Sequence, residues 1–207
     1  MNRFVISCGG TGGHLSPGIA LAEGLVARGD GAVLLISRRR VDAELSGRYP
    51  RLEFIAMPGS GFSWSPVTLV RFLWSQAGAV RLCWRVLRRE RPRAVVGFGG
   101  FTSFPLVVAA RLLGVPVALH ESNRVPGRAV RTLGRLARRV YLPPGVSLPG
   151  LRGDVIRPLP LPVRREIRRG SPEAARVALG LEPSRRVLAV LGGSQGAGAL
   201  NAWAAAP

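Results

Sequence analysis

Apolar runs alternate with helical patterns along most of the chain, and several runs are apolar throughout rather than at every second residue. Strands buried on both faces have this character, because helices cover both sides of their sheet. The expected strands lie at 3–8, 32–37, 52–56, 94–98, 116–120 and 139–142. This order predicts an α/β fold with a parallel sheet, helices on both faces, and ligands at the carboxyl ends of the strands.

A glycine loop follows the first expected strand. Four glycines fall within residues 9–13, His14 comes next, and a helical pattern leaves the loop. Glycine lets a ligand approach the backbone closely, and the N–H groups at a helix start favour a phosphate. The loop fails the dinucleotide fingerprint, because Leu15 stands where a glycine is needed, and it lacks the lysine of a P-loop. We expect an anion-binding turn, with His14 as a general base or as a structural histidine.

Further loops follow later strands. Residues 97–103 form a second glycine loop, and two such loops in one sheet suggest two sides of one anionic site. His120 either ties down a strand end or points into the same crevice, and Asn123 is expected to face a ligand. Segment 192–196 matches the nucleophile elbow of esterases, but both histidines precede its serine and no acidic residue follows it. A phosphate-contacting loop is the better interpretation.

Charge and composition narrow the classes of partner. The chain has no lysine, so its 30 basic residues are arginines, and its formal net charge is +19. This charge attracts phosphates, nucleic acid or anionic lipid surfaces. No nucleic-acid module is visible and aromatic residues make up 6%, so no nucleic-acid partner is expected. Cys8 and Cys83 lack metal spacing, and Cys8 is expected to be a small buried residue. Neither a signal peptide nor a transmembrane helix is expected, which suggests a cytoplasmic location.

The longest expected helix starts at Ser65-Pro66 and runs to about Arg89. One face of its wheel is apolar at the start and basic at the end, through Val67, Val70, Trp74, Ala77, Arg81, Arg85 and Arg88. Such a face suits insertion at an anionic membrane boundary, although its apolar half could instead pack against residues 59–64. A second arginine-rich helix is expected over 124–139, with either a solvated or a phosphate-attracting face.

The last third of the chain differs from the rest. The proline-rich and arginine-rich stretch 143–165 is expected to be an interdomain linker. A short helix at 171–179, a strand at 186–191 and a helix from Ala199 follow it. About forty residues cannot bury a core of their own. We therefore expect a first domain at 1–163, and a truncated second domain with its linker at 164–207.

The sequence resembles glycosyltransferase family 28, in particular its bacterial peptidoglycan N-acetylglucosaminyltransferases. Five segments carry this resemblance, and they come in the same order as in that family: 9–14, 97–101, 120–123, 162–164 and 192–197. The resemblance implies a GT-B fold, with two Rossmann-like lobes facing across a cleft. It also implies inverting transfer of N-acetylglucosamine from UDP-N-acetylglucosamine to undecaprenyl-pyrophosphoryl-N-acetylmuramoyl-pentapeptide (lipid I), which gives lipid II without a metal or cofactor. Such a protein is peripheral, on the anionic cytoplasmic face of the inner membrane.

The resemblance also implies roles for residues. His14 matches the histidine proposed as general base or site organiser. The positions implied to bind UDP-N-acetylglucosamine are Thr11, Gly12, Gly13, Asn123, Arg164 and Ser194. Those implied to border the acceptor pyrophosphate are Gly12, Gly13, His14, Gly99, Gly100 and Phe101. The face around Trp74 falls where the family carries its membrane patch.

The chain departs from the family pattern at three positions. Leu161 stands where asparagine is usual, Phe101 where tyrosine is common, and Ser122 where glutamine is common. Most of the donor lobe lies beyond Pro207, so the chain as printed is expected to be inactive. Two alternatives remain at this stage. One is a related GT-B enzyme acting on diacylglycerol or a sterol, and the other is a non-catalytic basic domain that binds nucleic acid or acidic lipid.

Overall fold

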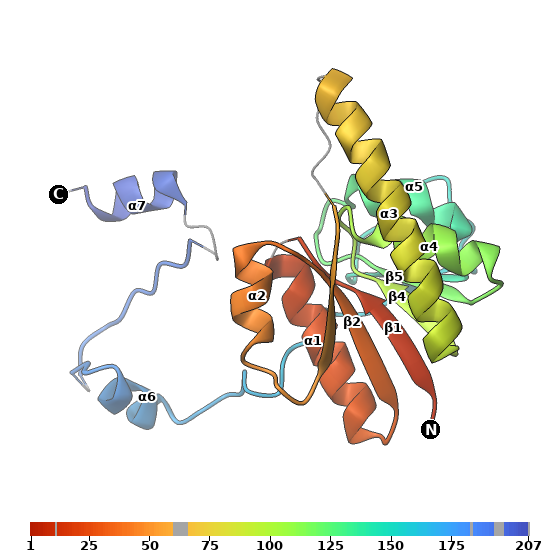
Figure 1. Cartoon of the computed structure of the whole chain (residues 1–207). Coiled ribbons are helices and arrows are strands. Elements are labelled where there is room, and N and C mark those ends of the chain that lie inside the picture. Colours follow the sequence, from red (N-terminus) through yellow and green to blue (C-terminus); the bar gives the residue numbers. More distant parts are fainter. Residues whose placement is uncertain (11, 60–65, 183, 193–196, 207) are drawn as a thin grey trace. The chain divides into compact units, whose positions relative to one another are not determined.

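The first part of the chain forms a parallel β-sheet. The computed structural model describes residues 1–10, 12–59, 66–182, 184–192 and 197–206, without the side chains of 66–73 (Figure 1). The strands are β1 (Arg3–Ser7), β2 (Gly31–Ser37), β3 (Glu53–Met57), β4 (Ala94–Gly97), β5 (Val117–His120), β6 (Arg139–Leu142) and β7 (Ile156–Pro158). All pair in parallel, in the order β3-β2-β1-β4-β5-β6-β7. The six strands expected in this part from the apolar runs are confirmed.

Helices cover both faces of this sheet, which confirms the α/β class (Figure 1). They are α1 (Gly12–Ala27), α2 (Arg40–Ser46), α3 (Pro66–Glu90), α4 (Ser103–Leu112) and α5 (Arg128–Leu133), the last followed by a 3₁₀ turn, η1 (Gly134–Leu136). Successive residues of β1 point to opposite faces. Val5 packs in the core with α3 and α4, whereas the next residue, Ile6, packs in the core with α1.

The strand order changes direction beside β1. From β1 the chain adds β2 and β3 on one side, and then returns to place β4 on the other side of β1. Helices α1 and α4 follow β1 and β4, so the loops that precede them leave neighbouring strands. Open α/β sheets bind their ligands at such a point, outside the carboxyl ends of the strands.

Two expectations about 124–165 are wrong. The stretch 143–165 is not simply a linker, because β7 lies within it and pairs with β6, and residues 1–165 form one compact unit. The sequence hides β7 because it is a three-residue edge strand that ends in Pro158, a position where proline is tolerated. The expected basic helix over 124–139 is shorter, since α5 and η1 cover only 128–136 and Arg139 begins β6.

Residues 166–207 form a second unit. Ser171 caps α6 (Pro172–Ala178) by accepting a hydrogen bond from the Ala174 N–H, and α7 spans Gly198–Ala204. The strand expected at 186–191 is wrong, because these residues pair with no strand in the described chain. Leu188 and Leu191 are 78% and 85% exposed. An apolar run becomes a parallel strand only where a neighbouring strand accepts its hydrogen bonds.

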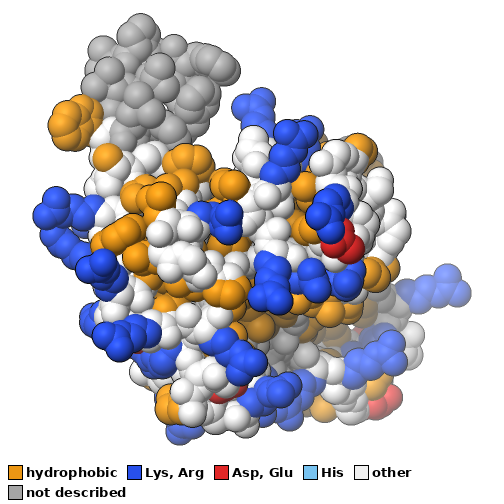
Figure 2. Space-filling model, turned by 90° about the vertical axis from the view of Figure 1, so that its right-hand side faces the viewer, with side chains coloured by type: hydrophobic (Ala, Val, Ile, Leu, Met, Phe, Trp, Pro, Cys, Tyr) orange, Lys and Arg blue, Asp and Glu red, His pale blue; other side chains and the backbone are white. Residues whose placement is uncertain are grey.

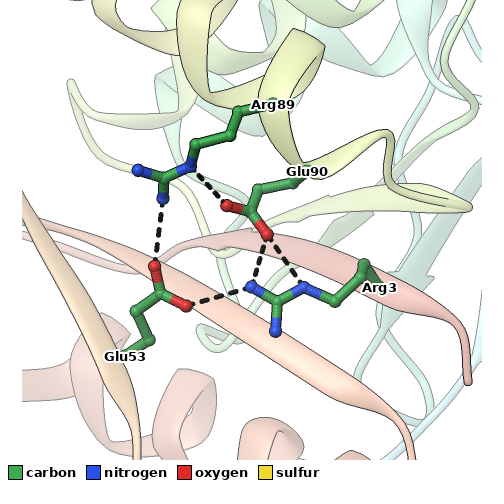
Figure 3. A network of polar contacts seen from close by, with 4 residues as sticks. All are labelled: Arg3, Glu53, Arg89 and Glu90. Carbon is green, nitrogen blue, oxygen red and sulfur yellow. Dashed lines mark hydrogen bonds and ion pairs between the residues drawn. The ribbon is translucent and has the colours of Figure 1, made fainter.

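Four charged side chains join β1, β3 and the end of α3 at the amino end of the sheet (Figure 3). Arg3 donates to Glu90 and, over 3.0 Å, to Glu53, and Arg89 bonds both carboxylates over 3.1 Å and 2.6 Å. Burial raises the pKa of Glu90, but the hydrogen bonds from Arg3 and Arg89 outweigh it and hold the pKa below its usual value. Glu90 is therefore a charged anchor between helix and sheet.

Glu90→Gln should lower the free energy of unfolding by about 1 kcal/mol at pH 7, because two arginines lose a shared carboxylate. Since the folded pKa is depressed, this stabilisation is present above the usual value of 4.5 and fades as the pH falls below it. Urea unfolding at several pH values measures the difference. Glu44→Gln is the matched control, because its pair with Arg40 is exposed, and it should cost under about 0.5 kcal/mol. Equal losses for both variants would contradict the anchor.

Candidate functional site

The two glycine loops meet at the carboxyl ends of β1 and β4. The Phe98 N–H donates to the Ser7 carbonyl over 2.9 Å, so the strands stay paired up to the loops. Beyond them, the buried Thr102 hydroxyl donates to the Gly9 carbonyl over 3.1 Å. The two loops are therefore bonded to each other; that they form two sides of one anionic site stays a prediction.

His14 lies in the first turn of α1, against the second glycine loop. A Cβ added at Gly99 would come within 3.4 Å of its Nε2, and one at Gly100 within 3.3 Å of its Nδ1. Both glycines have positive φ, +92° and +70°, which side-chain-bearing residues rarely adopt. The glycines thus serve two purposes here: they allow the turn and they leave room for the imidazole.

A cavity of about 420 Å³ opens beside His14. The second glycine loop and the segment after β5 complete its wall, through Gly99, Gly100, Phe101, Glu121, Asn123, Gly127, Arg128, Ala129 and Val130. Phe101 also lies against the first loop, since a Cβ at Gly10 would be 3.3 Å from its ring. The space is large enough for part of a sugar-phosphate, and a histidine, an amide and an arginine line it.

Glu121 shapes the segment after β5. Its side chain is buried, and its carboxylate accepts hydrogen bonds from the Asn123 N–H and side-chain amide, both over 2.9 Å. The Gly127 N–H donates to its other oxygen over 2.7 Å. These bonds turn the segment and place exposed Asn123 on the cavity wall. Glu121 lies within the segment 120–123, but the sequence alone assigns it no role because its burial is known only from the fold.

The environment of His14 favours a neutral imidazole. Burial lowers its pKa below the ordinary 6.5, and the carboxylates of Glu121 and Asp42 only partly oppose that shift. A neutral imidazole can accept a proton at physiological pH, as a general base must.

If His14 is the base, the acid limb of the kcat/KM profile should lie below pH 6.5, because activity is lost only as the pH falls through the lowered pKa. Glu121→Gln removes a charge that raises this pKa, so it should move the limb to still lower pH. Kinetics from pH 5 to 8 measure both, with Glu23→Gln as control, since Glu23 lies in α1 but does not line this cavity. A limb above pH 7 would contradict this assignment.

Only some of the other expected site residues lie close to His14. Gly12 and Gly13 open α1 directly before His14. Thr11 and Ser194 lie outside the described residues. Arg164 is not among the described residues that line the cavity, and its Nη1 donates to the Tyr49 hydroxyl over 2.8 Å.

His120 and Cys8 are core residues. His120 is 2% exposed and its ring lies 5.2 Å from that of Phe98, so it belongs under the loops rather than in the crevice. Burial lowers its pKa, although the Pro160 carbonyl opposes the shift. Cys8 is fully buried, as expected, and burial raises the pKa of its thiol.

The outer face of α3 is apolar and basic where its side chains are described. Trp74 is 76% exposed, Ala77 is exposed, and Arg81, Arg85 and Arg88 are exposed further along the helix. The opposite side is buried in the core through Cys83 and Leu87. The side chains of Val67 and Val70, and residues 60–65, lie outside the description. Figure 2 shows hydrophobic side chains gathered on this side of the molecule, with arginines around them. Within the described chain, every helix is too short or too polar to cross a membrane.

Comparisons with known proteins agree with these features. The model of the glycosyltransferase family 28 N-terminal domain matches residues 4–142. A protein of Opitutus terrae named UDP-N-acetylglucosamine--N-acetylmuramyl-(pentapeptide) pyrophosphoryl-undecaprenol N-acetylglucosamine transferase is 58% identical over 203 residues, which are 98% of this chain and 54% of that protein. A protein of the same name from Solidesulfovibrio magneticus is 37% identical over 97% of this chain and 53% of its own length.

Solved structures give the same result. The crystal structure of Acinetobacter baumannii MurG matches with a TM-score of 0.64 and 26% identity, over 75% of this chain and 45% of that one. A UDP-GlcNAc 2-epimerase from Neisseria meningitidis shares the fold alone, at 12% identity and a TM-score of 0.56. The chain spans about half the length of the curated relatives it matches. With the family model covering most of its first unit, the chain belongs to glycosyltransferase family 28.

Proposed function

We propose that this chain is the acceptor-binding part of an inverting glycosyltransferase that moves N-acetylglucosamine from UDP-N-acetylglucosamine to lipid I. The observation that carries the proposal is the position of His14, a half-buried imidazole with a lowered pKa, held against the second glycine loop on a cavity that Asn123 also lines. The names of the Opitutus and Solidesulfovibrio relatives supply the donor and acceptor classes.

In this mechanism the acceptor hydroxyl lies beside the His14 imidazole. As the hydroxyl oxygen attacks the anomeric carbon, its proton passes to a ring nitrogen of His14. The bond between that carbon and the diphosphate oxygen breaks on the opposite side, so the configuration inverts and UDP leaves. The first turn of α1, which begins at Gly12, presents N–H groups that favour the acceptor pyrophosphate. Asn123 is placed to contact the transferred sugar.

We also propose that the protein associates peripherally with an anionic inner-membrane surface. The acceptor carries a long lipid, so the enzyme must work at the membrane that holds it. The exposed Trp74 and the arginines that follow it on α3 supply an apolar wedge and a positive surface. We propose 1–163 as the acceptor and membrane lobe, and 164–207 as the start of the donor lobe, with Arg164 and Ser194 as donor contacts.

The experiment is a transfer assay with a form of the protein that carries the complete second lobe. Radiolabelled UDP-N-acetylglucosamine is supplied with a lipid I analogue or with diacylglycerol. Product from lipid I alone supports the proposal, and product from diacylglycerol alone favours a related lipid glycosyltransferase. Salt-sensitive DNA binding without any transfer would indicate a basic binding domain instead.

A further inference from the structure

A fully buried carboxylate lies behind the first glycine loop. Asp42, in α2, is 0% exposed. Its Oδ2 accepts the Gly10 N–H over 2.9 Å, the Ser37 N–H over 2.8 Å and the Ser37 hydroxyl over 2.6 Å. Burying a carboxylate is costly unless hydrogen bonds compensate it, and three bonds do so at this oxygen. Through them Asp42 ties the first loop to the end of β2.

The backbone of the first glycine loop is packed tightly against the end of β2. A Cβ at Gly9 would come within 2.2 Å of the Ser37 nitrogen, so the backbone of the loop lies directly on the end of β2. Gly10 has a φ of +116°, a conformation that other residues rarely adopt. The bond from its N–H to Asp42 holds that conformation, four residues before His14.

Exposed Arg39 supports the same turn from its other side. Its Nη1 donates to the Gly10 carbonyl over 2.8 Å, and its guanidinium lies 5.7 Å from the centre of the Phe101 ring. Both backbone polar groups of Gly10 are therefore bonded to the segment that follows β2, one to Asp42 and one to Arg39. Since Phe101 belongs to the second glycine loop, this segment fixes the two loops together.

We propose that Asp42 is a positioning residue, which locks the Gly9-Gly10 turn and thereby sets the place of His14 over the second glycine loop. The Gly10 N–H is committed to Asp42, so it is not a donor for a bound phosphate. Asp42 does not line the cavity, and apart from its charge, which raises the pKa of His14, it acts through the turn. As a role in the transfer reaction, the assignment rests on the proposed function.

The first test uses the unmodified 207-residue chain, labelled with ¹⁵N and ¹³C. A scalar coupling across the hydrogen bond from the Gly10 nitrogen to the Asp42 carboxyl carbon should be measurable by NMR. Its absence, with the Gly10 amide exchanging as fast as an exposed one, would overturn the proposal without any variant. This measurement does not depend on whether a substituted chain folds.

The second test compares variants of the same chain. Asp42→Asn should speed amide exchange at Gly10 about tenfold, because hydrogen bonds to charged groups are the strong ones, and it should shift the ring ¹⁵N signals of His14. Arg39→Ala should act in the same direction and more weakly. Two controls should change neither signal: Arg38→Ala, an exposed neighbour, and Glu90→Gln, which destabilises the sheet at its other end. If Glu90→Gln reproduces the effect of Asp42→Asn, general destabilisation explains it and the proposal fails.

The kinetic test uses the form with a complete second lobe. Asp42→Asn should lower kcat about tenfold or more while KM for UDP-N-acetylglucosamine stays within about threefold, because the base and not the donor site is displaced. An unchanged kcat would overturn the role in transfer. If the unsubstituted enzyme makes no lipid II, the proposed function fails, and the NMR tests still decide whether Asp42 holds the turn.

Discussion

His14→Ala should lower the turnover of lipid I by roughly 10² or more in a form with the complete second lobe, if His14 is the general base. The imidazole lies against Gly99 and Gly100 at the switch of strand order, and burial keeps it neutral. Glu121 then remains as a base among the described residues that line the cavity, but hydrogen bonds from Asn123 and Gly127 already occupy both of its oxygens. Steady-state transfer of labelled N-acetylglucosamine measures the loss.

The controls for this prediction separate chemistry from folding. His120→Ala tests the other histidine, which lies in the core. This variant should be less stable than the unsubstituted enzyme, but each folded molecule should keep its turnover. KM for the donor should change little in His14→Ala, since the base acts in the transition state. A decrease in turnover of less than threefold would remove His14 from the role of base and leave it as an organiser of the two loops.

Trp74→Glu should weaken binding to phosphatidylglycerol vesicles by about tenfold. The substitution removes a 76% exposed indole from the apolar part of α3 and places a negative charge on the face that carries Arg81 two turns further along. Loss of a large apolar side chain and repulsion by an anionic surface act in the same direction. Co-sedimentation of the 207-residue chain with vesicles, at fixed ionic strength, measures the change.

The matched control is Val26→Glu, an exposed apolar residue near the end of α1, in the helix layer on the other side of the sheet. It adds the same charge and should leave vesicle binding within twofold. Neutral phosphatidylcholine vesicles should bind the unsubstituted chain far less, because its arginines then meet no opposite charge. Equal binding by Trp74→Glu and the unsubstituted chain would contradict the membrane face.

The sequence predicts the central sheet well because parallel strands that are buried on both faces have unbroken apolar sequences. Segment 32–37 is such a run, and every residue of β2 is buried. β7 escapes prediction because it adds only three residues to an edge and is held by backbone bonds to β6. The segment 186–191 shows the reverse error. Its composition is that of a strand, but pairing is a property of neighbours, which composition cannot supply.

The sequence predicts some residues of the site and not others. Its glycines and His14 are visible in the sequence because their clustering is unusual and their local chemistry is simple. Asp42 is not visible as a support, since it acts on a backbone N–H that only the folded chain brings close. Glu121 accepts from N–H groups two and six residues away, but its burial is known only from the fold. The Gly10 partner of Asp42 is 32 residues away, across a helix and a strand. A local sequence pattern predicts the residues that contact a ligand. The residues that keep those contacting residues in position are identified from the tertiary structure.

The positive charge on the outer face of α3 comes from arginines alone. Arginine is the basic side chain that carries its charge most persistently in proteins. The two histidines of the chain lie in or beneath the loops instead. If His14 is the general base, acidification would protonate it while the attraction of this face to an anionic lipid surface persists. Where lipid binding and transfer both occur as proposed, they would respond differently to pH, and one preparation of protein could be switched off and on again while it stays on its vesicles.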